Sequence, residues 1–406
     1  MAHTARSKKE TKEFFDPPEE LNRKVDQLAE LVKKSKHFIV FTGAGISTST
    51  GIPDFRSGMD TKLETGPGKW ELQAHSQSKG ATAHKAGKTT STVKAIPSPT
   101  HMLLVKLQQE GILKHIISQN TDGLHRRSGI PQKALWELHG NNNMEWCKKC
   151  KHEYLRDFKC SRPKSKHITG RNCDNPACGG QLRDTIINFG ESLPQDALDG
   201  GFEQASLADL CVVFGSSLTV TPAADMPLEV VKKKNSPGDL VIINLQETPL
   251  DVIASLRIFS KCDDVSKLLA EKLSVEIPPF RLRRRLLVTT APTGKGQRVE
   301  VMGTDIEGSP FSYLKQVQFN ASDVVSHHET EPAWLIHRGG SMVKITLHFQ
   351  GHYYEPQLTI NFMSNKGERV HKEYLLEYDP HNCQWSTNET GDGLAAQLEK
   401  QAKISS

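Results

Sequence analysis

Four apolar segments of this chain end in the same way, and this repetition constrains the fold more than any other feature. Each run of strand-forming residues leads into small or polar residues. The four segments are HFIVFTGAGIS (37–47), HIISQNTDGLH (115–125), ADLCVVFGSSL (208–218) and GDLVIINLQ (238–246). Segments with helical spacing, such as 19–36 and 100–116, lie between or beside them. Strands that alternate with helices predict a parallel α/β sheet. Ligands of such sheets bind at the carboxyl ends of the strands, so we expect binding residues in the polar endings.

The remaining segments differ in character and predict further parts. Residues 147–180 contain paired cysteines and lack clear periodicity, whereas the last 120 or so residues alternate as half-buried strands do. We therefore expect these parts: a flexible N-terminus at 1–18, an α/β domain at 19–280 with a small lobe at about 144–182 and a flexible basic loop at about 74–95, a basic segment at 281–285, an all-β accessory module at 286–386, and a flexible tail at 387–406.

The cysteines indicate a metal site. The chain has eight Cys, and four of them form two tight pairs, Cys147/Cys150 and Cys173/Cys178. The charged start MAHTARSKKETKEFF predicts no secretory signal, so metal ligation or free thiols are favoured over disulfides. Four thiolates from two tight turns suit tetrahedral Zn²⁺, and a full set of protein ligands predicts a structural site. Three nearby residues are competing ligands: His152, Cys160 and His167.

Charge and hydropathy exclude few classes of binding partner. The formal net charge is +5, and its basic excess lies before residue 286. The run RLRRR (281–285) is typical of a nuclear-import signal, a phosphate-contacting patch or a solvated charge run. No segment approaches the roughly 18 apolar residues that a membrane helix needs, so we expect no membrane partner.

The Gly-rich turn TGAGIS (42–47) follows an apolar strand, so its backbone amides could receive phosphates. The dinucleotide fingerprint G-x-G-x-x-G requires glycine where Thr48 stands. There is also no obvious second strand with an acidic residue about 20 positions further on. A standard dehydrogenase is therefore disfavoured, and a plain strand-to-helix turn remains the alternative for this loop.

A series of motifs in a fixed order resembles the sirtuins, the NAD-dependent protein-lysine deacylases, over about residues 20–280. The motifs are GAGISTSTGIPDFR (43–56), SQNTDGLHRRSG (118–129), ELHGN (137–141), GSSLTVTPA (215–223) and INLQ (243–246). Two further stretches, 170–186 and 261–280, resemble the nuclear branch that contains vertebrate sirtuins six and seven. The resemblance implies a Rossmann-like parallel-sheet domain with a small zinc-ribbon lobe that is held by the four paired cysteines. The β module lies outside it.

The resemblance also implies a reaction and its catalytic residues. The amide oxygen of an acyl-lysine attacks the ribose carbon of NAD, nicotinamide leaves, and the acyl group ends on ADP-ribose. His139 matches the general base, a role that suits imidazole because its ordinary pKa lies close to working pH. Asn120 and Asp122 match residues of the nicotinamide and ribose pocket. The alternatives are a structural histidine and two ordinary turn residues.

The cofactor-binding residues implied by the resemblance come from all four strand endings. They are Ala44, Gly45, Ser47, Thr48, Phe55, Arg56, Trp70, Gln119, Gly215, Ser216, Ser217, Asn244, Gln246 and Cys262. Core packing is the alternative for Phe55 and plain burial for Cys262. One departure from the family concerns SGMDTKLET (57–65), which separates DFR from GPGKW (66–70) and alters the spacing that places Trp70.

The expected function is therefore NAD-dependent deacetylation or deacylation of histones or other nuclear proteins, with NAD⁺ as co-substrate and one structural Zn²⁺. The resemblance to the nuclear branch predicts a nuclear location. Partners would be an acyl-lysine protein and, through the basic segments, nucleosomes or DNA. Two alternatives remain: protein mono-ADP-ribosyl transfer from the same NAD site, and a non-catalytic chromatin-binding protein that senses NAD.

Overall fold

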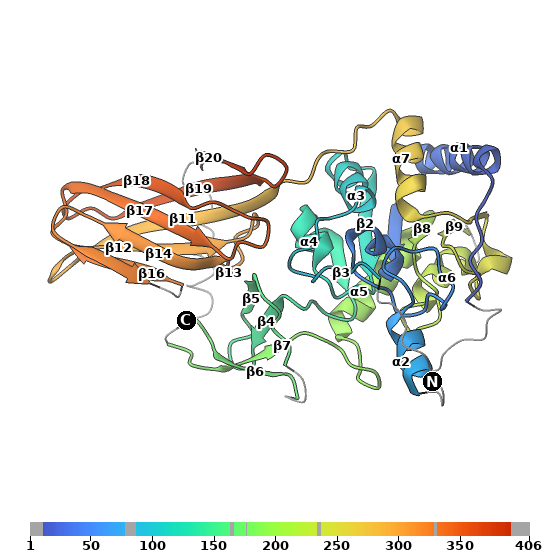
Figure 1. Cartoon of the computed structure of the whole chain (residues 1–406), viewed down its shortest axis with the longest axis horizontal. Helices are drawn as coiled ribbons and strands as arrows, with labels where there is room; N and C mark the ends of the chain where they lie inside the picture. The colour runs from blue at the N-terminus through green and yellow to red at the C-terminus, as the bar shows by residue number, and fades with distance from the viewer. Residues whose placement is uncertain are drawn as a thin grey trace. The chain divides into compact units, whose positions relative to one another are not determined.

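The computed structural model describes residues 11–77, 87–162, 166–175, 177–233, 237–328 and 331–390 (Figure 1). The chain divides into two compact units. Unit 1 contains Met1–Asn141 and Ile186–Pro279, and unit 2 contains Asn142–Thr185 and Phe280–Ser406. None of the helices among the described residues has both the length and the apolar character that crossing a bilayer requires.

Unit 1 is built on a six-stranded sheet in the order β10-β9-β8-β1-β2-β3. Its strands are β1 (Phe38–Thr42), β2 (Leu113–Ser118), β3 (Leu135–Glu137), β8 (Leu210–Phe214), β9 (Asp239–Ile243) and β10 (Leu256–Ile258). Every pair of neighbours is parallel. The predicted parallel α/β sheet is confirmed, and its strand order is that of the Rossmann fold. The order reverses between β1 and β8, which is the point where such sheets bind ligands.

Helices cover both faces of this sheet, which explains why its central strands β1 and β8 are buried at every position. Phe38 and Val40 of β1 pack in one core with residues of α1 (Pro18–Lys34), α3 (Pro99–Gln109) and α7 (Cys262–Leu273). Ile39 and Phe41 point the other way, into a core with residues of α5 (Gln195–Leu207) and α6 (Asp225–Lys232). The shorter helical elements lie at the strand ends and in loops: η1 (Ala44–Ile46), η2 (Thr48–Thr50), α2 (Lys69–Gln77), α4 (Leu124–Ser128), η3 (Gln132–Ala134) and η4 (Asp251–Ile253).

Unit 2 combines a small cysteine-bearing module with a larger β module. The small module contains β4 (Met144–Cys147), β5 (Glu153–Arg156), β6 (Ile168–Asn172) and β7 (Gln181–Asp184). The β module has two antiparallel sheets, ordered β16-β12-β11-β19-β20 and β15-β14-β17-β18, which share one apolar core. Their strands are β11 (Leu282–Thr293), β12 (Gly296–Thr304), β14 (Leu314–Asn320), β15 (Val325–His328), β16 (Ala333–His337), β17 (Ser341–Phe349), β18 (Leu358–Ser364), β19 (Val370–Asp379) and β20 (Gln384–Thr390). The expected mainly β C-terminal part is confirmed.

Strand β13 (Phe311–Ser312) joins the two modules of unit 2. Although it follows β12 in the chain, it pairs in parallel with β5 and lies at the edge of the small module's sheet. Arg156 of β5 donates a hydrogen bond to the Ser312 hydroxyl at 2.5 Å. The Asp157 amide donates to the Ser312 carbonyl at 3.1 Å. The β module therefore completes the sheet of the cysteine-bearing module.

The arginines of the basic run 281–285 are paired with carboxylates inside unit 2. Its arginines belong to or adjoin β11, and each is paired with a carboxylate. The pairs are Arg281 with Asp379, Arg283 with Glu377, Arg284 with Asp157 and Arg285 with Glu373. Three of the four carboxylates come from β19, the antiparallel neighbour of β11. The cationic run is therefore largely neutralised inside unit 2.

The Arg284–Asp157 pair is the buried member of this set and yields a stability prediction. Its atoms lie 3.1 Å apart, and the side chains are 1% and 2% exposed. Breaking such a pair from one side typically costs about 3–5 kcal/mol, because the other charge stays buried. We expect Arg284→Met to lose about that much unfolding free energy in urea titrations. Arg283→Met is the control: Arg283 is 47% exposed, and loss of an exposed pair costs at most about 1 kcal/mol. Equal losses would contradict the prediction.

Among the described residues of unit 1, three histidines are buried and make its stability depend on pH. Burial lowers the pKa of His101 and His125 to about 3 and that of His115 to about 4, from an ordinary 6.5. The unfolded chain therefore binds more protons, so stability is full above pH 6.5 and is lost as the pH falls toward 3. Each histidine contributes up to about 1.4 kcal/mol per pH unit. We expect the urea midpoint to fall between pH 7 and pH 5, and to fall less in His115→Gln. A rising midpoint would contradict this.

The segments expected to be flexible lie only partly within the described residues. In the N-terminal segment, Phe14 packs against Phe259, and Asp16 forms an ion pair with Lys24 of α1. In the basic loop, residues 74–77 belong to α2, and the Thr90 amide donates to the Gly51 carbonyl. Residues 78–86 of that loop and 391–406 of the tail lie outside the described residues.

Candidate active site and candidate metal centre

Two glycine loops cross in backbone contact at the point where the strand order reverses. The Gly45 amide, after β1, donates to the Gly215 carbonyl, after β8, at 2.9 Å. A Cβ on Gly45 would lie 2.6 Å from the Gly215 Cα, and one on Gly43 would lie 2.7 Å from the Gly215 carbonyl oxygen. Gly215 also has a φ of +61°, which disfavours side chains. These glycines therefore let the loops that follow β1 and β8 meet at the expected ligand-binding edge.

Asn120 and Asp122 are buried in the loop after β2 and are tied to the β1 loop. The Asn120 side-chain amide donates to the Gly43 carbonyl at 3.0 Å. One Asp122 carboxylate oxygen accepts a hydrogen bond from the Ser47 hydroxyl at 2.7 Å, and the other accepts one from the Leu124 amide at 2.9 Å. Both side chains are less than a tenth exposed. The structure thus brings these two predicted residues and Ser47 together.

His139 follows β3, the strand beside β2, and its imidazole is held in one tautomer. Its Nδ1 lies 3.0 Å from the Gln119 carbonyl oxygen. Because a carbonyl can only accept, Nδ1 carries the proton and Nε2 keeps its lone pair. Burial lowers the pKa of His139, and the hydrogen bond to Gln119 opposes part of that effect. The side chain is therefore a neutral base near pH 7 with Nε2 as its basic atom.

The predicted residues at the ends of β8 and β9 form hydrogen bonds within the protein. The Ser216 hydroxyl donates to the Gln119 side-chain oxygen at 2.7 Å, which links the ends of β8 and β2. Ser217 lies 2.9 Å from the Thr219 hydroxyl. The Asn244 side chain, after β9, donates to the Gln246 carbonyl at 2.9 Å.

Of the remaining predicted residues, one forms a hydrogen bond between two loops and three begin helical elements. Gln246 is buried, and its amide donates to the Arg56 carbonyl at 3.2 Å. Ala44 begins η1 and Thr48 begins η2. Cys262 begins α7 and is buried, and burial raises the pKa of its thiol.

Trp70 reaches the β1 loop despite the inserted residues 57–65. The Trp70 amide donates to the Phe55 carbonyl at 3.1 Å, so the chain returns to its starting point after the insertion. The Trp70 ring lies 5.0 Å from the Phe55 ring, and the Arg56 guanidinium lies 4.6 Å from the Trp70 ring. A Cβ on Gly68 would lie 2.3 Å from the Arg56 nitrogen, so this return requires glycine. The inserted residues 57–65 therefore loop out, and Phe55, Arg56 and Trp70 remain in one cluster.

Sequence reasoning missed several residues that shape this edge. Phe189 packs on Trp70 with ring centroids 5.4 Å apart, and no sequence signal marks it. Asp54 accepts hydrogen bonds from the Ser57 hydroxyl and amide, and burial raises the pKa of its carboxyl. Its position inside the GIPDFR motif was the signal that could have found it. Thr42 and Ser118, the last residues of β1 and β2, share a hydrogen bond of 2.9 Å.

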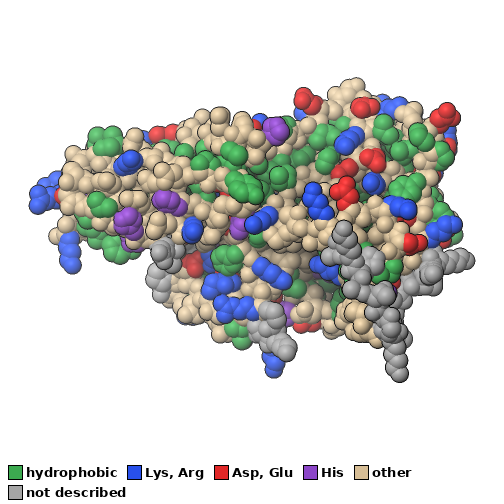
Figure 2. Space-filling model, viewed as in Figure 1, with side chains coloured by type: hydrophobic (Ala, Val, Ile, Leu, Met, Phe, Trp, Pro, Cys, Tyr) green, Lys and Arg blue, Asp and Glu red, His purple; other side chains and the backbone are tan. Residues whose placement is uncertain are grey.

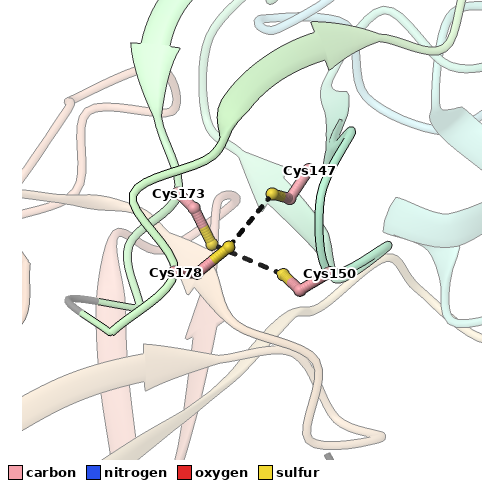
Figure 3. Close-up of side chains that lie close together, drawn as sticks. All are labelled: Cys147, Cys150, Cys173 and Cys178. Atoms are coloured by element: carbon pink, nitrogen blue, oxygen red, sulfur yellow. Dashed lines mark hydrogen bonds between the residues drawn. The ribbon is translucent and has the colours of Figure 1, made fainter.

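The four predicted metal ligands form one cluster in unit 2 (Figure 3). The sulfur atoms of Cys147, Cys150, Cys173 and Cys178 all lie within 4.8 Å of one another. Cys147 and Cys178, and likewise Cys150 and Cys173, are 3.6 Å apart. A disulfide would require about 2.05 Å, whereas a tetrahedral Zn²⁺ with bonds of about 2.3 Å separates its sulfurs by about 3.8 Å. The donor set fits one Zn²⁺ with four protein ligands.

The surroundings of the cysteine cluster support the same assignment. The Tyr154 hydroxyl lies 3.0 Å from the Cys173 sulfur. A Cβ on Gly180 would lie 2.5 Å from the Cys147 sulfur, so glycine makes room for the cluster. Within the described residues the three competing ligands are not part of it: Cys160 contacts the Phe158 carbonyl, His152 packs on Tyr154, and His167 pairs with Asp184.

Comparison with known proteins places this architecture in a family. A model described as "Sir2 family" matches residues 43–222. The NAD-dependent protein deacetylase SRT1 of Arabidopsis thaliana is 41% identical over 318 residues, which cover 77% of this chain and 63% of that protein. The NAD-dependent protein deacetylase Sirt6 of Drosophila melanogaster is 37% identical over 279 residues, which cover 66% of this chain and 81% of that protein. This chain belongs to the Sir2 family.

The relatives also bear on the branch of this sirtuin. The NAD-dependent protein deacetylase sirtuin-7 of Bos taurus is 41% identical over 281 residues, covering 67% of this chain and 66% of that protein. The expected resemblance to sirtuins six and seven is confirmed. The chain spans less than two thirds of the length of the Arabidopsis and bovine relatives. The family model ends before the β module begins, so that module lies outside the family match.

Proposed function

We propose that this sirtuin removes acyl groups from protein lysines in an NAD-dependent reaction, transferring the acyl group to ADP-ribose with release of nicotinamide. The observation that carries the proposal is the protonation state of His139. Its Nδ1–H donates to the Gln119 carbonyl, so the imidazole is neutral and Nε2 is its basic atom. It stands at the end of β3, next to the strand whose loop holds Asn120 and Asp122. The names of the relatives support the same activity.

The residues at the crossing of the glycine loops fit NAD. Close backbone contact between Gly45 and Gly215 leaves the edge of the sheet without side chains at these positions, so a pyrophosphate can approach the main chain there. Phe55, Trp70 and Phe189 form an aromatic cluster beside this edge. We propose that the cluster keeps water from the reacting ribose carbon and that Arg56 meets the phosphates.

Each remaining residue has a role that its contacts permit. When bound, NAD⁺ supplies a ribose carbon from which nicotinamide can leave. Asn120 and Asp122 offer an amide and a carboxylate that orient the carboxamide and the ribose hydroxyls. Nε2 of His139 accepts the proton of a ribose hydroxyl, which makes that oxygen a nucleophile. Gln119, Ser216, Asn244 and Gln246 contact the nucleotide from the ends of β2, β8 and β9.

The state of His139 gives an expected pH dependence. Because burial places the pKa of His139 below its ordinary 6.5, the basic form persists as the pH falls below 7. We expect the rate at saturating substrates to stay level down to about pH 6.5 and to fall below it, as Nε2 takes a proton. A pH–rate profile on an acylated peptide measures this. An acid limb centred well above pH 6.5 would contradict the assignment of His139.

The proposal is tested by following nicotinamide release from the full chain. The assay combines NAD⁺ with histone peptides that carry acetyl or long-chain acyl lysine, or no acyl group. We expect release that requires both NAD⁺ and an acyl-lysine, in equal amounts with deacylated peptide. Binding of NAD⁺ without turnover on any acylated peptide would indicate a non-catalytic NAD-sensing protein instead.

We further propose that the substrates are nuclear proteins, with histones as the first candidates. The relationship to sirtuin-7 and Sirt6 supports this. The paired arginines of 281–285 do not favour DNA contact through that run. Moreover, the face drawn in Figure 2 carries both basic and acidic side chains. We therefore propose that this sirtuin contacts nucleosomes mainly by binding an acylated histone, and less through the run 281–285.

A further inference from the structure

Two buried histidines lie close to the proposed active site, and the proposed reaction does not use them. His101 is on α3 and His125 is on α4, with 0% and 2% of their surfaces exposed. Their ring centroids are 5.0 Å apart. Burial lowers the pKa of each to about 3, so both are neutral at working pH. A buried neutral histidine still needs partners for one N–H donor and one acceptor nitrogen.

The tautomer of His101 follows from its contacts with Ser98. The Ser98 amide donates to Nδ1 of His101 at 3.3 Å, and the Ser98 hydroxyl lies 2.8 Å from the same atom. An atom that accepts from an amide carries no proton, so the proton of His101 is on Nε2. Within the described part of the chain, this buried Nε2 has no hydrogen-bond partner. His101 thus holds an unused donor.

The tautomer of His125 is the complementary one. Its Nε2 lies 2.9 Å from the Thr42 hydroxyl oxygen, and the Thr42 hydroxyl donates its only hydrogen to Ser118 at 2.9 Å. Thr42 can therefore only accept from His125, so the proton of His125 is on Nε2 and its Nδ1 is an acceptor. Among the described residues, the buried Nδ1 also lacks a hydrogen-bond partner. The unused donor and the unused acceptor stand on neighbouring rings.

The chain of hydrogen bonds continues from His125 to the active-site loop. Thr42 ends β1 and Ser118 ends β2. The Ser118 hydroxyl oxygen also accepts a hydrogen bond from the backbone amide of Asn120 at 3.1 Å. The Asn120 side chain then donates to the Gly43 carbonyl at 3.0 Å, one residue beyond Thr42. The buried imidazole is therefore linked at one end to the backbone that aims Asn120.

We propose that His125, as its Nε2–H tautomer, is a positioning residue for Asn120 that acts through Thr42 and Ser118. The positioning role rests on the proposed deacylase function, whereas the tautomers of His125 and His101 do not depend on it.

The tautomers are tested first, by a measurement that needs no activity. Full-length protein labelled with ¹⁵N-histidine is examined through its imidazole nitrogens between pH 6 and pH 8, and the His101→Gln and His125→Gln spectra assign the signals. We expect both residues to be protonated on Nε2, with Nε2 protons that exchange slowly with water. Protonation of His125 on Nδ1, or titration of His125 in this range, would overturn the proposal.

The positioning role is tested by a set of matched variants. His125→Leu removes the donor to Thr42, whereas His125→Gln keeps an N–H in reach. We expect kcat to fall roughly tenfold in His125→Leu, which is the effect of about one hydrogen bond. KM for the acylated peptide should hardly change, and His125→Gln should recover most of kcat. His115→Gln, which changes another buried histidine of the same unit, should retain wild-type kcat.

Other outcomes are equally informative. Wild-type kcat in a folded His125→Leu, or equal losses in the Leu and Gln variants, would overturn the positioning role. If His125→Leu does not fold, the pair Thr42→Val and Thr42→Ser replaces it, and only Thr42→Val should lower kcat. If the wild-type chain itself shows no turnover, the proposed function fails, while the imidazole spectra still decide on the tautomers.

Discussion

Replacing His139 with Tyr is expected to lower kcat for NAD-dependent deacylation by roughly 10²–10⁴-fold, the usual contribution of a positioned general base. Tyrosine has no basic atom at neutral pH, so Nε2 of His139 would have no substitute as acceptor of the ribose proton. The half-buried site lies at the end of β3, outside the apolar cores. The fold should therefore persist. Steady-state turnover on an acetylated histone peptide, with circular dichroism as the check on folding, measures the effect.

Two comparisons sharpen this prediction. His381→Gln changes an exposed histidine of the β module and should leave turnover unchanged. NAD⁺ binding by His139→Tyr should stay within about an order of magnitude of wild type, because Asn120, Asp122 and Ser216 keep their contacts. Wild-type turnover in a folded His139→Tyr would remove His139 from the mechanism.

Cys147→Ser is expected to abolish the metal site and to unfold the small module of unit 2. A serine hydroxyl is a poor substitute for a thiolate, and a structural Zn²⁺ contributes roughly 10–16 kcal/mol of apparent binding energy in zinc-finger peptides. We expect zinc analysis of the purified chain to fall from about one ion per chain to nearly none. Hydrogen exchange should accelerate in β4, β5 and β7, and also in β13, which pairs with β5.

The control for the metal prediction is Cys383→Ser, which changes an exposed cysteine of the β module. This variant should keep its zinc and its exchange pattern. Unchanged metal content in Cys147→Ser would contradict the assignment of the four cysteines. Loss of zinc without faster exchange in β13 would instead show that the two modules of unit 2 are not energetically coupled.

The sequence predicted the parts of the site that local pattern determines. Each predicted strand that ends in polar residues is present, because apolar runs and turn residues are local properties of the chain. The order of the strands then brings Gly45 and Gly215 together. The paired spacing of the cysteines likewise predicted the metal cluster, since a closed set of four thiolates needs two tight turns.

The features that escaped prediction depend on partners far away in the sequence. The run 281–285 was expected to be a basic segment because four of its five residues are arginines. Its carboxylate partners lie mainly on β19, about 90 residues further on. The packing of Phe189 on Trp70 and the return of the chain after residues 57–65 are also tertiary contacts. No local pattern encodes them.

Contacts between residues far apart in the sequence also explain why unit 2 combines two modules. Sequence character separated the cysteine-bearing segment from the β module, whereas the structure places both in unit 2. Strand β13 has only two residues, too few to carry an alternation signal. Its pairing with β5, and the buried contact of Arg284 with Asp157, could be found only in the structure.

The fate of labelled NAD⁺ distinguishes lysine deacylation from ADP-ribosylation of protein. The full chain is incubated with an acetylated histone peptide and NAD⁺ that carries its label in the ADP-ribose part, and the products are separated by mass. We expect the label to appear on free O-acetyl-ADP-ribose, in amounts equal to the nicotinamide released and the peptide deacetylated. Label that instead becomes attached to protein, or acetate released as the free acid with unmodified ADP-ribose, would contradict it.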